Sequence, residues 1–210
     1  MKITKYAAID IGSNALRLLI SNVIEHKKET ITLKNSLVRV PIRLGQDAFT
    51  TGIISRNNIK QLSRSMKSFK NLMKVHDVKN YLAFATAALR EAKNGKYVID
   101  RVKKKSGINI QIIDGKKEAR IISNSNVFDG IDPKKTILYI DVGGGSTELS
   151  IIKNQKTLKS ISLKIGTVRL LNDGVENETW IKAKKWVTTN TKSFTNIFLL
   201  GTGGNINKLH

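Results

Sequence analysis

The sequence predicts an α/β protein made of two similar lobes around a cleft. Segments with strand character alternate with segments of helical period along the 210 residues. The stretch Ile9-Asp10-Ile11-Gly12 returns 131 residues later as Ile140-Asp141-Val142-Gly143. In both copies an aspartate ends an apolar strand, where a buried charge is costly unless it binds something. The repeat therefore predicts two facing hairpins with a binding site in the cleft between them.

The first copy opens as an antiparallel meander and continues with alternating helices and strands. The expected strands are Tyr6–Ile11, Leu16–Ile24, one or two within Thr30–Leu44, Tyr81–Ala85 and Ile108–Ile113. The expected helices run from Ser55 to about Lys74 and over Ala87–Lys93, Tyr97–Lys104 and Gly115–Asn124. The first of these helices has the clearest signals, because Ser55 can cap it and Ile59, Leu62, Met66 and Phe69 follow the helical period.

The second copy repeats the strand-rich opening. Its expected strands are Thr136–Ile140, Thr147–Ile152, Leu158–Leu163 and Asn196–Leu200, and a helix is expected over Glu178–Phe194. We therefore expect one lobe over residues 1–124 and a second over 125–210.

Composition limits the classes of function. The chain has no cysteine, which excludes disulfides, thiolate metal sites and cysteine nucleophiles. No apolar run reaches the length of a membrane span and no signal peptide is evident, so we expect a cytoplasmic protein without a membrane partner. The net charge of +21 favours polyanion partners. A drift toward AT-rich codons is the alternative, since the excess is in lysine (28 Lys against 9 Arg) and is spread along the chain.

Three turns rich in small residues can expose backbone N–H groups to an anion. They are Gly12-Ser13-Asn14, Gly143-Gly144-Gly145-Ser146-Thr147 and Gly201-Thr202-Gly203-Gly204. None has the Walker or the Rossmann pattern. Because an aspartate precedes each of the first two turns, the pattern favours a site for phosphate and a divalent metal ion.

Six blocks of the sequence resemble, in order, the motifs of the exopolyphosphatase / guanosine pentaphosphate phosphohydrolase family. They are Ala8–Asn14 with Arg17-Leu18, Ala85–Asn94, Ile113–Ala119, Asp141–Leu149, Ser162–Leu170 and Gly201–Asn205. The resemblance implies an actin/Hsp70/sugar-kinase type of fold, with two ribonuclease-H-like lobes around a cleft. It also implies hydrolysis of a terminal phosphoanhydride in inorganic polyphosphate or guanosine pentaphosphate, with Mg²⁺ or another divalent cation as cofactor.

The resemblance also assigns residues. The catalytic glutamate of the family falls on Glu118, the arginine of its second block on Arg90, and the carboxylates of its motifs, which would organise Mg²⁺, on Asp10, Asp141 and Glu148. The expected phosphate-binding residues are Gly12, Ser13, Asn14, Arg17, Gly143, Gly144, Gly145, Ser146, Thr147, Gly203 and Gly204. Simpler roles stay open: Glu118 as a carboxylate that only favours a helix start, Arg90 and Arg17 in salt bridges across the cleft, and Glu148 as a partner of Arg17.

The chain departs from the family in two ways. Lys117 stands where the family has a first acidic residue, and by comparison with the family we expect the second lobe to be shorter than a complete one, without its later helices and last strand. We therefore keep as an alternative a non-catalytic binder of polyphosphate or guanosine alarmones. A nucleic-acid partner is supported only by the net charge, and a sugar or acetate kinase by the fold alone. Dimers are common in the family, so a homodimer could shield the shortened lobe.

Overall fold

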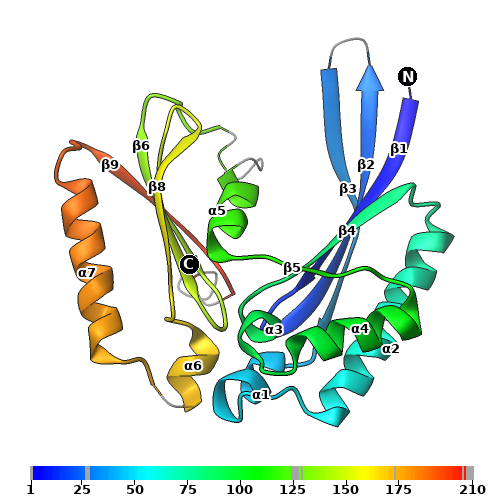
Figure 1. Ribbon diagram of the computed structural model, residues 1–210. Helices are drawn as coiled ribbons and strands as arrows, with labels where there is room; N and C mark the ends of the chain where they lie inside the picture. Colours follow the sequence, from blue (N-terminus) through cyan, green and yellow to red (C-terminus); the bar gives the residue numbers. More distant parts are fainter. Residues whose placement is uncertain are drawn as a thin grey trace. The chain divides into compact units, whose positions relative to one another are not determined.

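The computed structural model describes residues 2–26, 29–123, 128, 130–172, 174–204 and 206. They form two compact units, Met1–Ile112 (unit 1) and Ile113–His210 (unit 2) (Figure 1). The units divide between Ile112 and Ile113, whereas the sequence analysis placed the division after residue 124. The helix Gly115–Ser123 (α5) accounts for the difference, because it packs against two strands of unit 2.

Unit 1 contains a five-stranded sheet in the order β3-β2-β1-β4-β5. Its strands are β1 (Lys2–Ile11), β2 (Ala15–His26), β3 (Glu29–Pro41), β4 (Asn80–Ala85) and β5 (Gln111–Ile112). The first three form the expected antiparallel meander, and β4 and β5 continue the sheet in parallel. Its helices are α1 (Leu44–Thr50), α2 (Arg56–Val75), α3 (Ala87–Glu91) and α4 (Gly95–Ser106).

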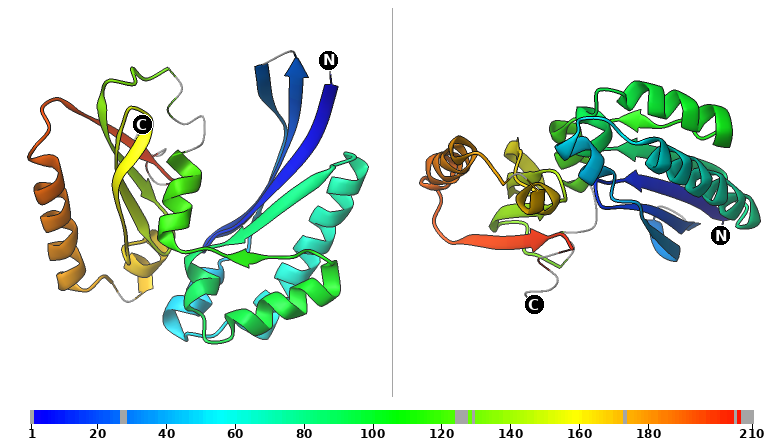
Figure 2. Two further views of the ribbon diagram at one scale, coloured as in Figure 1. Left: turned by 45° about the horizontal axis from the view of Figure 1, so that its top comes forward. Right: turned by 90° about the horizontal axis from the view of Figure 1, so that it is seen from below.

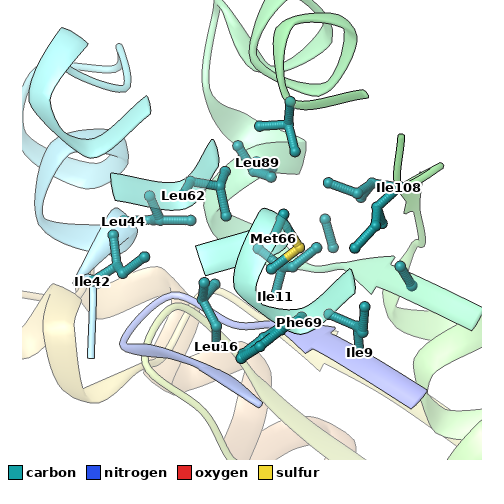
Figure 3. Close-up of a cluster of buried hydrophobic side chains, with 14 of the residues drawn as sticks. Ile9, Ile11, Leu16, Ile42, Leu44, Leu62, Met66, Phe69, Leu89 and Ile108 are labelled. Atoms are coloured by element: carbon teal, nitrogen blue, oxygen red, sulfur yellow. The ribbon is translucent and has the colours of Figure 1, made fainter. Parts of the chain in front are cut away.

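The hydrophobic core of unit 1 lies on one face of this sheet, beneath α2 and α4 (Figure 2). Alternate side chains of β1, among them Ile9 and Ile11, point to this face because successive residues of a strand face opposite sides. Met66 and Phe69 of α2 pack against them (Figure 3). The cap of α2 is the predicted one, since the Ser55 hydroxyl accepts a hydrogen bond from the Asn58 N–H at 3.2 Å.

Unit 2 contains a four-stranded sheet in the order β8-β7-β6-β9. Its strands are β6 (Thr136–Val142), β7 (Thr147–Lys153), β8 (Lys156–Leu163) and β9 (Ile197–Thr202). Strands β6, β7 and β8 are antiparallel neighbours, and β9 runs parallel to β6. Its helices are α5, α6 (Thr167–Asn172) and α7 (Asn177–Thr191).

Helices cover both faces of the second sheet (Figure 1). On one face, Ile122 of α5 packs with Phe128 and Tyr139. On the other face, Trp186 of α7 packs in the cluster that contains Leu149. The sheet is therefore the layer between the helices of its two faces. Several polar residues on its α5 side are shielded from solvent.

Some elements differ from the expectations. The strand expected over 108–113 is reduced to the two residues of β5, although Ile108 and Ile110 are buried in the core as an apolar run should be. The short helices α1 and α6 were not predicted. Within the described residues, no helix is both long enough and apolar enough to cross a membrane.

Candidate active site

The turn between β6 and β7 is held from one side by the start of α6. The carbonyl oxygens of its three glycines, Gly143 to Gly145, accept hydrogen bonds from Thr167 N at 3.1 Å, Val168 N at 2.8 Å and Arg169 Nε at 2.6 Å. In a trans peptide the next N–H points opposite to the carbonyl, and the peptides described here are trans. The N–H groups of Gly144, Gly145 and Ser146 therefore point away from α6, as in an anion-binding nest.

The turn between β1 and β2 is built in the same way. The N–H of Gly12 donates to the Ala15 carbonyl at 3.2 Å, and its counterpart in unit 2, Gly143, donates to Ser146 at 2.9 Å. The carbonyl oxygens of Ser13 and Asn14 accept hydrogen bonds from the chain entering α1, at 2.7 and 3.0 Å. The N–H groups of Asn14 and Ala15 consequently point away from α1. Ala15 was not among the predicted residues, because a backbone donor leaves no side-chain signal.

Two glycines are required by close backbone contacts. A Cβ atom on Gly166 would collide with the carbonyl of Gly144, so only glycine lets the chain entering α6 lie against the turn. Gly203 has φ +117° and a Cβ there would collide with the Val142 carbonyl. Gly204 is exposed and has open space at its Cβ position. The phosphate-binding roles of Gly203 and Gly204 remain predictions.

Four polar residues lie at one level across the second sheet. Ser162 of β8 is opposite Glu148 of β7, Glu148 is opposite Asp141 of β6, and Asp141 is opposite Thr202 of β9. Residues directly opposite each other share one face of a sheet, with Cβ atoms about 4.5–5.5 Å apart in antiparallel pairs. We call these four residues the polar row. Two carboxylates at its centre thus face each other.

Hydrogen bonds fix both carboxylates of the polar row. The Ser162 hydroxyl donates to Glu148 Oε1 at 2.8 Å, and Glu148 is only 2% exposed. The Thr202 hydroxyl donates to Asp141 Oδ1 at 2.8 Å. Tyr139, two residues before Asp141 on the same face, lies with its hydroxyl 2.6 Å from the Thr202 hydroxyl.

Burial, and to a smaller extent the neighbouring acids, make Tyr139 harder to ionise. Burial raises the pKa of Tyr139 to about 12, and the negative charges of Asp141 and Glu148 add to the increase. Tyr139 therefore stays protonated at every physiological pH and can act as a permanent hydrogen-bond donor.

Glu118 lies in the first turn of α5, on unit 2. Asp114 starts this helix: its side chain accepts a hydrogen bond from Lys117 N at 2.7 Å, and its carbonyl accepts one from Glu118 N at 3.0 Å. The helix packs on β8 and β7, and Gly115 lies so close to Ser162 that a Cβ would collide with it. The Oε2 atom of Glu118 is buried. The helix start therefore lies beside one end of the polar row.

In unit 1 the equivalent carboxylate has a different partner. The β1–β2 register places Asp10 opposite Arg17, and the two side chains form an ion pair at 3.2 Å with about half of each exposed. Arg90 lies in the last turn of α3 and is partly exposed. The Asp10–Arg17 pair is the kind of salt bridge left open for Arg17, but it forms within unit 1. The pairing of Arg17 with Glu148 stays a prediction.

The structure thus divides the predicted residues between the units. Unit 1 carries Asp10, Arg17, Arg90 and the first turn, and unit 2 carries Glu118 with the other two carboxylates and the second turn. In the second turn, the Thr147 hydroxyl donates to the Ile165 carbonyl at 2.8 Å and is used in the scaffold. Within the described residues, no three Asp, Glu or His side chains gather as metal ligands. Sequence reasoning missed the supporting side chains Tyr139, Ser162, Arg169 and Thr202.

Comparison with known proteins identifies the family. The model of the Ppx/GppA phosphatase family matches residues 19–194. The chain belongs to this family. Solved structures agree: an exopolyphosphatase from Cytophaga hutchinsonii matches with a TM-score of 0.82 at 25% identity over 98% of this chain and 69% of that chain. The Aquifex aeolicus Ppx/GppA family member matches with a TM-score of 0.76 at 27% identity, over 99% of this chain and 69% of that chain. The predicted family and the predicted α/β fold class with two sheets are confirmed.

Two curated relatives are longer than this chain. The bifunctional 3-dehydroquinate synthase/phosphatase of Fusobacterium nucleatum is 36% identical over 94% of this chain but only 32% of its own length. Exopolyphosphatase 1 of Mycobacterium tuberculosis is 27% identical over 83% of this chain and 50% of its own length. The chain thus spans half or less of the length of these two relatives.

Proposed function

We propose that this Ppx/GppA family member is a Mg²⁺-dependent phosphohydrolase that releases terminal phosphate from inorganic polyphosphate, guanosine pentaphosphate or both. The observation that carries the proposal is the composition of unit 2. A turn with outward N–H groups, two facing carboxylates and the half-buried Glu118 all belong to this one compact unit. These are the parts that phosphoanhydride hydrolysis requires: anion binding, charge neutralisation and a group to direct water.

The donor set suits Mg²⁺. Asp141 and Glu148 offer carboxylate oxygens from directly opposite positions, and Mg²⁺ binds through one or two carboxylates while keeping waters and phosphate oxygens as its other ligands. When bound, the ion would neutralise charge on the phosphate groups. Asp10 of unit 1 is paired with Arg17, and its expected role in organising Mg²⁺ stays a prediction.

The chain's own groups would carry the remaining tasks. The N–H groups following the carbonyls of Gly143–Gly145 would hold oxygens of the transferred phosphoryl group. Glu118 would orient a water and accept its proton, as a carboxylate of this kind does in general base catalysis. Arg90 and Arg17, if released from its pair, would offer charged donors to further phosphate oxygens.

The substrate class follows from charge and from the relatives. The net charge of +21 suits a polyanion better than a neutral ester. Curated relatives at 27% identity are named exopolyphosphatases, which supports polyphosphate, while the relative at 36% identity is named only as a phosphatase.

The test is phosphate release from long-chain polyphosphate and from guanosine pentaphosphate with Mg²⁺, comparing the wild type with Glu118→Gln. Glu178→Gln is a matched control, since Glu178 is also an acid in the first turn of a helix of unit 2. We expect Glu118→Gln to lower kcat by at least about 100-fold, a usual magnitude for general base catalysis, and Glu178→Gln to leave it unchanged. Equal activity in all three proteins would refute the role of Glu118. No release by folded wild type from either substrate would refute the enzyme, and retained binding of polyphosphate would then favour the non-catalytic binder.

A further inference from the structure

The hydroxyl groups of Tyr139 and Thr202 form an ordered chain that ends on Asp141. A carboxylate only accepts hydrogen bonds, so the single hydroxyl proton of Thr202 lies toward Asp141 Oδ1, 2.8 Å away. Thr202 must then accept at its oxygen, and Tyr139 donates to it at 2.6 Å. Tyr139 is 3% exposed and packs edge-on against Phe128 at 5.6 Å, so its ring is held by the core. The direction of both hydrogen bonds is therefore set by the carboxylate at the end.

The equivalent positions of unit 1 have no such chain. Offset by 131 residues, Tyr139 corresponds to Ala8, and the strand register pairs Asp10 with Phe84 where it pairs Asp141 with Thr202. Neither Ala8 nor Phe84 has a side-chain donor. Asp10 is instead held by Arg17 across the hairpin. The two units thus hold their strand-end aspartates by different means.

We propose that Thr202 and Tyr139 are positioning residues that hold the Asp141 carboxylate in place for a divalent cation shared with Glu148. The proposal rests on the proposed function, because it assigns the cation to this pair. Thr202 binds Oδ1 and thereby leaves Oδ2 for a further ligand. Tyr139 fixes the Thr202 hydroxyl so that its proton cannot turn away from the aspartate.

Repulsion explains why such support is needed in unit 2. Asp141 faces a carboxylate, Glu148, where Asp10 faces a guanidinium. Without a hydrogen bond, the side chain of Asp141 would gain by rotating away from Glu148, and the two oxygens would no longer converge on one ion. Hydrogen bonds to ligating carboxylates keep them in the binding rotamer, and their removal typically costs 10–100-fold in metal affinity or activity.

The test measures Mn²⁺ binding directly, by electron paramagnetic resonance of the free ion, together with kcat and KM for phosphate release. Thr202→Val removes the donor, Thr202→Ser keeps it, and Tyr139→Phe removes the outer donor. Thr157→Val is the matched control, because Thr157 lies in β8 of the same sheet and its buried hydroxyl makes no hydrogen bond with the residues described. Thermal unfolding shows that each variant is folded.

We expect Thr202→Val to weaken Mn²⁺ binding about tenfold or more and to lower kcat with little change in KM. Thr202→Ser and Thr157→Val should bind Mn²⁺ as the wild type does, and Tyr139→Phe should fall between. Wild-type Mn²⁺ affinity in Thr202→Val, or equal losses in the valine and serine variants, would overturn the proposal. Absence of Mn²⁺ binding to the wild type would also overturn it.

The two proposals can fail separately. A wild type that binds Mn²⁺ but releases no phosphate would refute the enzyme, while weaker binding in Thr202→Val would still support the positioning role. A wild type that hydrolyses polyphosphate, with a Thr202→Val variant of unchanged Mn²⁺ affinity and kcat, would keep the enzyme and remove the positioning role.

Discussion

Replacing Glu148 by glutamine should change stability in opposite directions without and with a divalent cation. Glu148 faces Asp141 across the β6–β7 pair and is almost fully buried. Glutamine has nearly the same shape and can still accept the hydrogen bond from Ser162. The substitution therefore keeps the shape of the side chain and the hydrogen bond from Ser162 and removes one negative charge. Without metal this relieves repulsion, and with metal it removes a ligand.

The size of the repulsion follows from the register. The Cβ atoms of opposite residues lie about 5 Å apart, and two charges at about this distance repel by about 3 kcal/mol at an effective dielectric constant of about 20. Because solvent and neighbouring dipoles offset part of this energy, we expect Glu148→Gln to raise the free energy of unfolding by about 1–3 kcal/mol in a metal chelator. For a unit of about 100 residues this is an increase in Tm of at least about 4 °C.

The assay is thermal unfolding at pH 8, in chelator and then in Mg²⁺ at increasing concentration. A ligand at 100 times its Kd stabilises the folded protein by about 2.7 kcal/mol, so the wild type should gain several degrees. Glu148→Gln should gain little. Its higher Tm in chelator should therefore shrink toward, or fall below, the Tm of the wild type as Mg²⁺ is added. Glu178→Gln controls for the change in net charge and should lose only a few tenths of a kcal/mol, since Glu178 favours the start of α7. A Glu148→Gln variant that is less stable in chelator and keeps the full response to Mg²⁺ would refute the reasoning.

Two further predictions follow from the same sheet. In the folded protein the pKa of Tyr139 is about 12, above its ordinary value of 10.0. The protonated phenol therefore contributes at most about 3 kcal/mol to the free energy of unfolding. This contribution is complete below pH 10 and is lost as the pH rises toward 12. Denaturant unfolding at pH 8 and pH 11 should show a loss in the wild type that exceeds the loss in Tyr139→Phe, and equal losses would contradict this assignment. Gly166→Ala should lower the free energy of unfolding by about 1–3 kcal/mol, because its Cβ would collide with the turn at Gly144, while Gly204→Ala has open space and should change little. Chemical denaturation measures both, and an equal effect of the two substitutions would show that the close contact at Gly166 is unimportant.

The sequence was sufficient for features that depend on local pattern. Alternating apolar residues and the turn at Gly12–Asn14 predicted the first hairpin, and Ser55 with the helical period predicted α2. The pairing of Asp10 with Arg17 was also available, since counting back from the turn places these residues opposite each other. The sequence analysis instead assigned Asp10 to Mg²⁺ and Arg17 to phosphate.

Features that depend on distant contacts could not be read in this way. Thr202 meets Asp141 from 61 residues away, and only the register of β6 with β9 brings them together. The place of α5 in unit 2 depends on distant contacts too, since nothing within Gly115–Ser123 reveals that this helix packs on β8. Short helices such as α6 lack enough residues to show a period, so the restraint of the glycine turn by Val168 was also hidden.

The two copies of the internal repeat therefore share a backbone conformation but differ in the charge of the residue opposite the aspartate. Both hairpins close with the same glycine hydrogen bond and both turn their carbonyls toward a following helix, so both can present N–H groups to an anion. At the residue opposite the aspartate, unit 1 has Arg17 and unit 2 has Glu148. A guanidinium at this position completes the charge balance of Asp10, whereas a second carboxylate creates a demand for a cation at Asp141. We therefore place the proposed cation in unit 2, where the hydroxyl chain from Tyr139 holds Asp141.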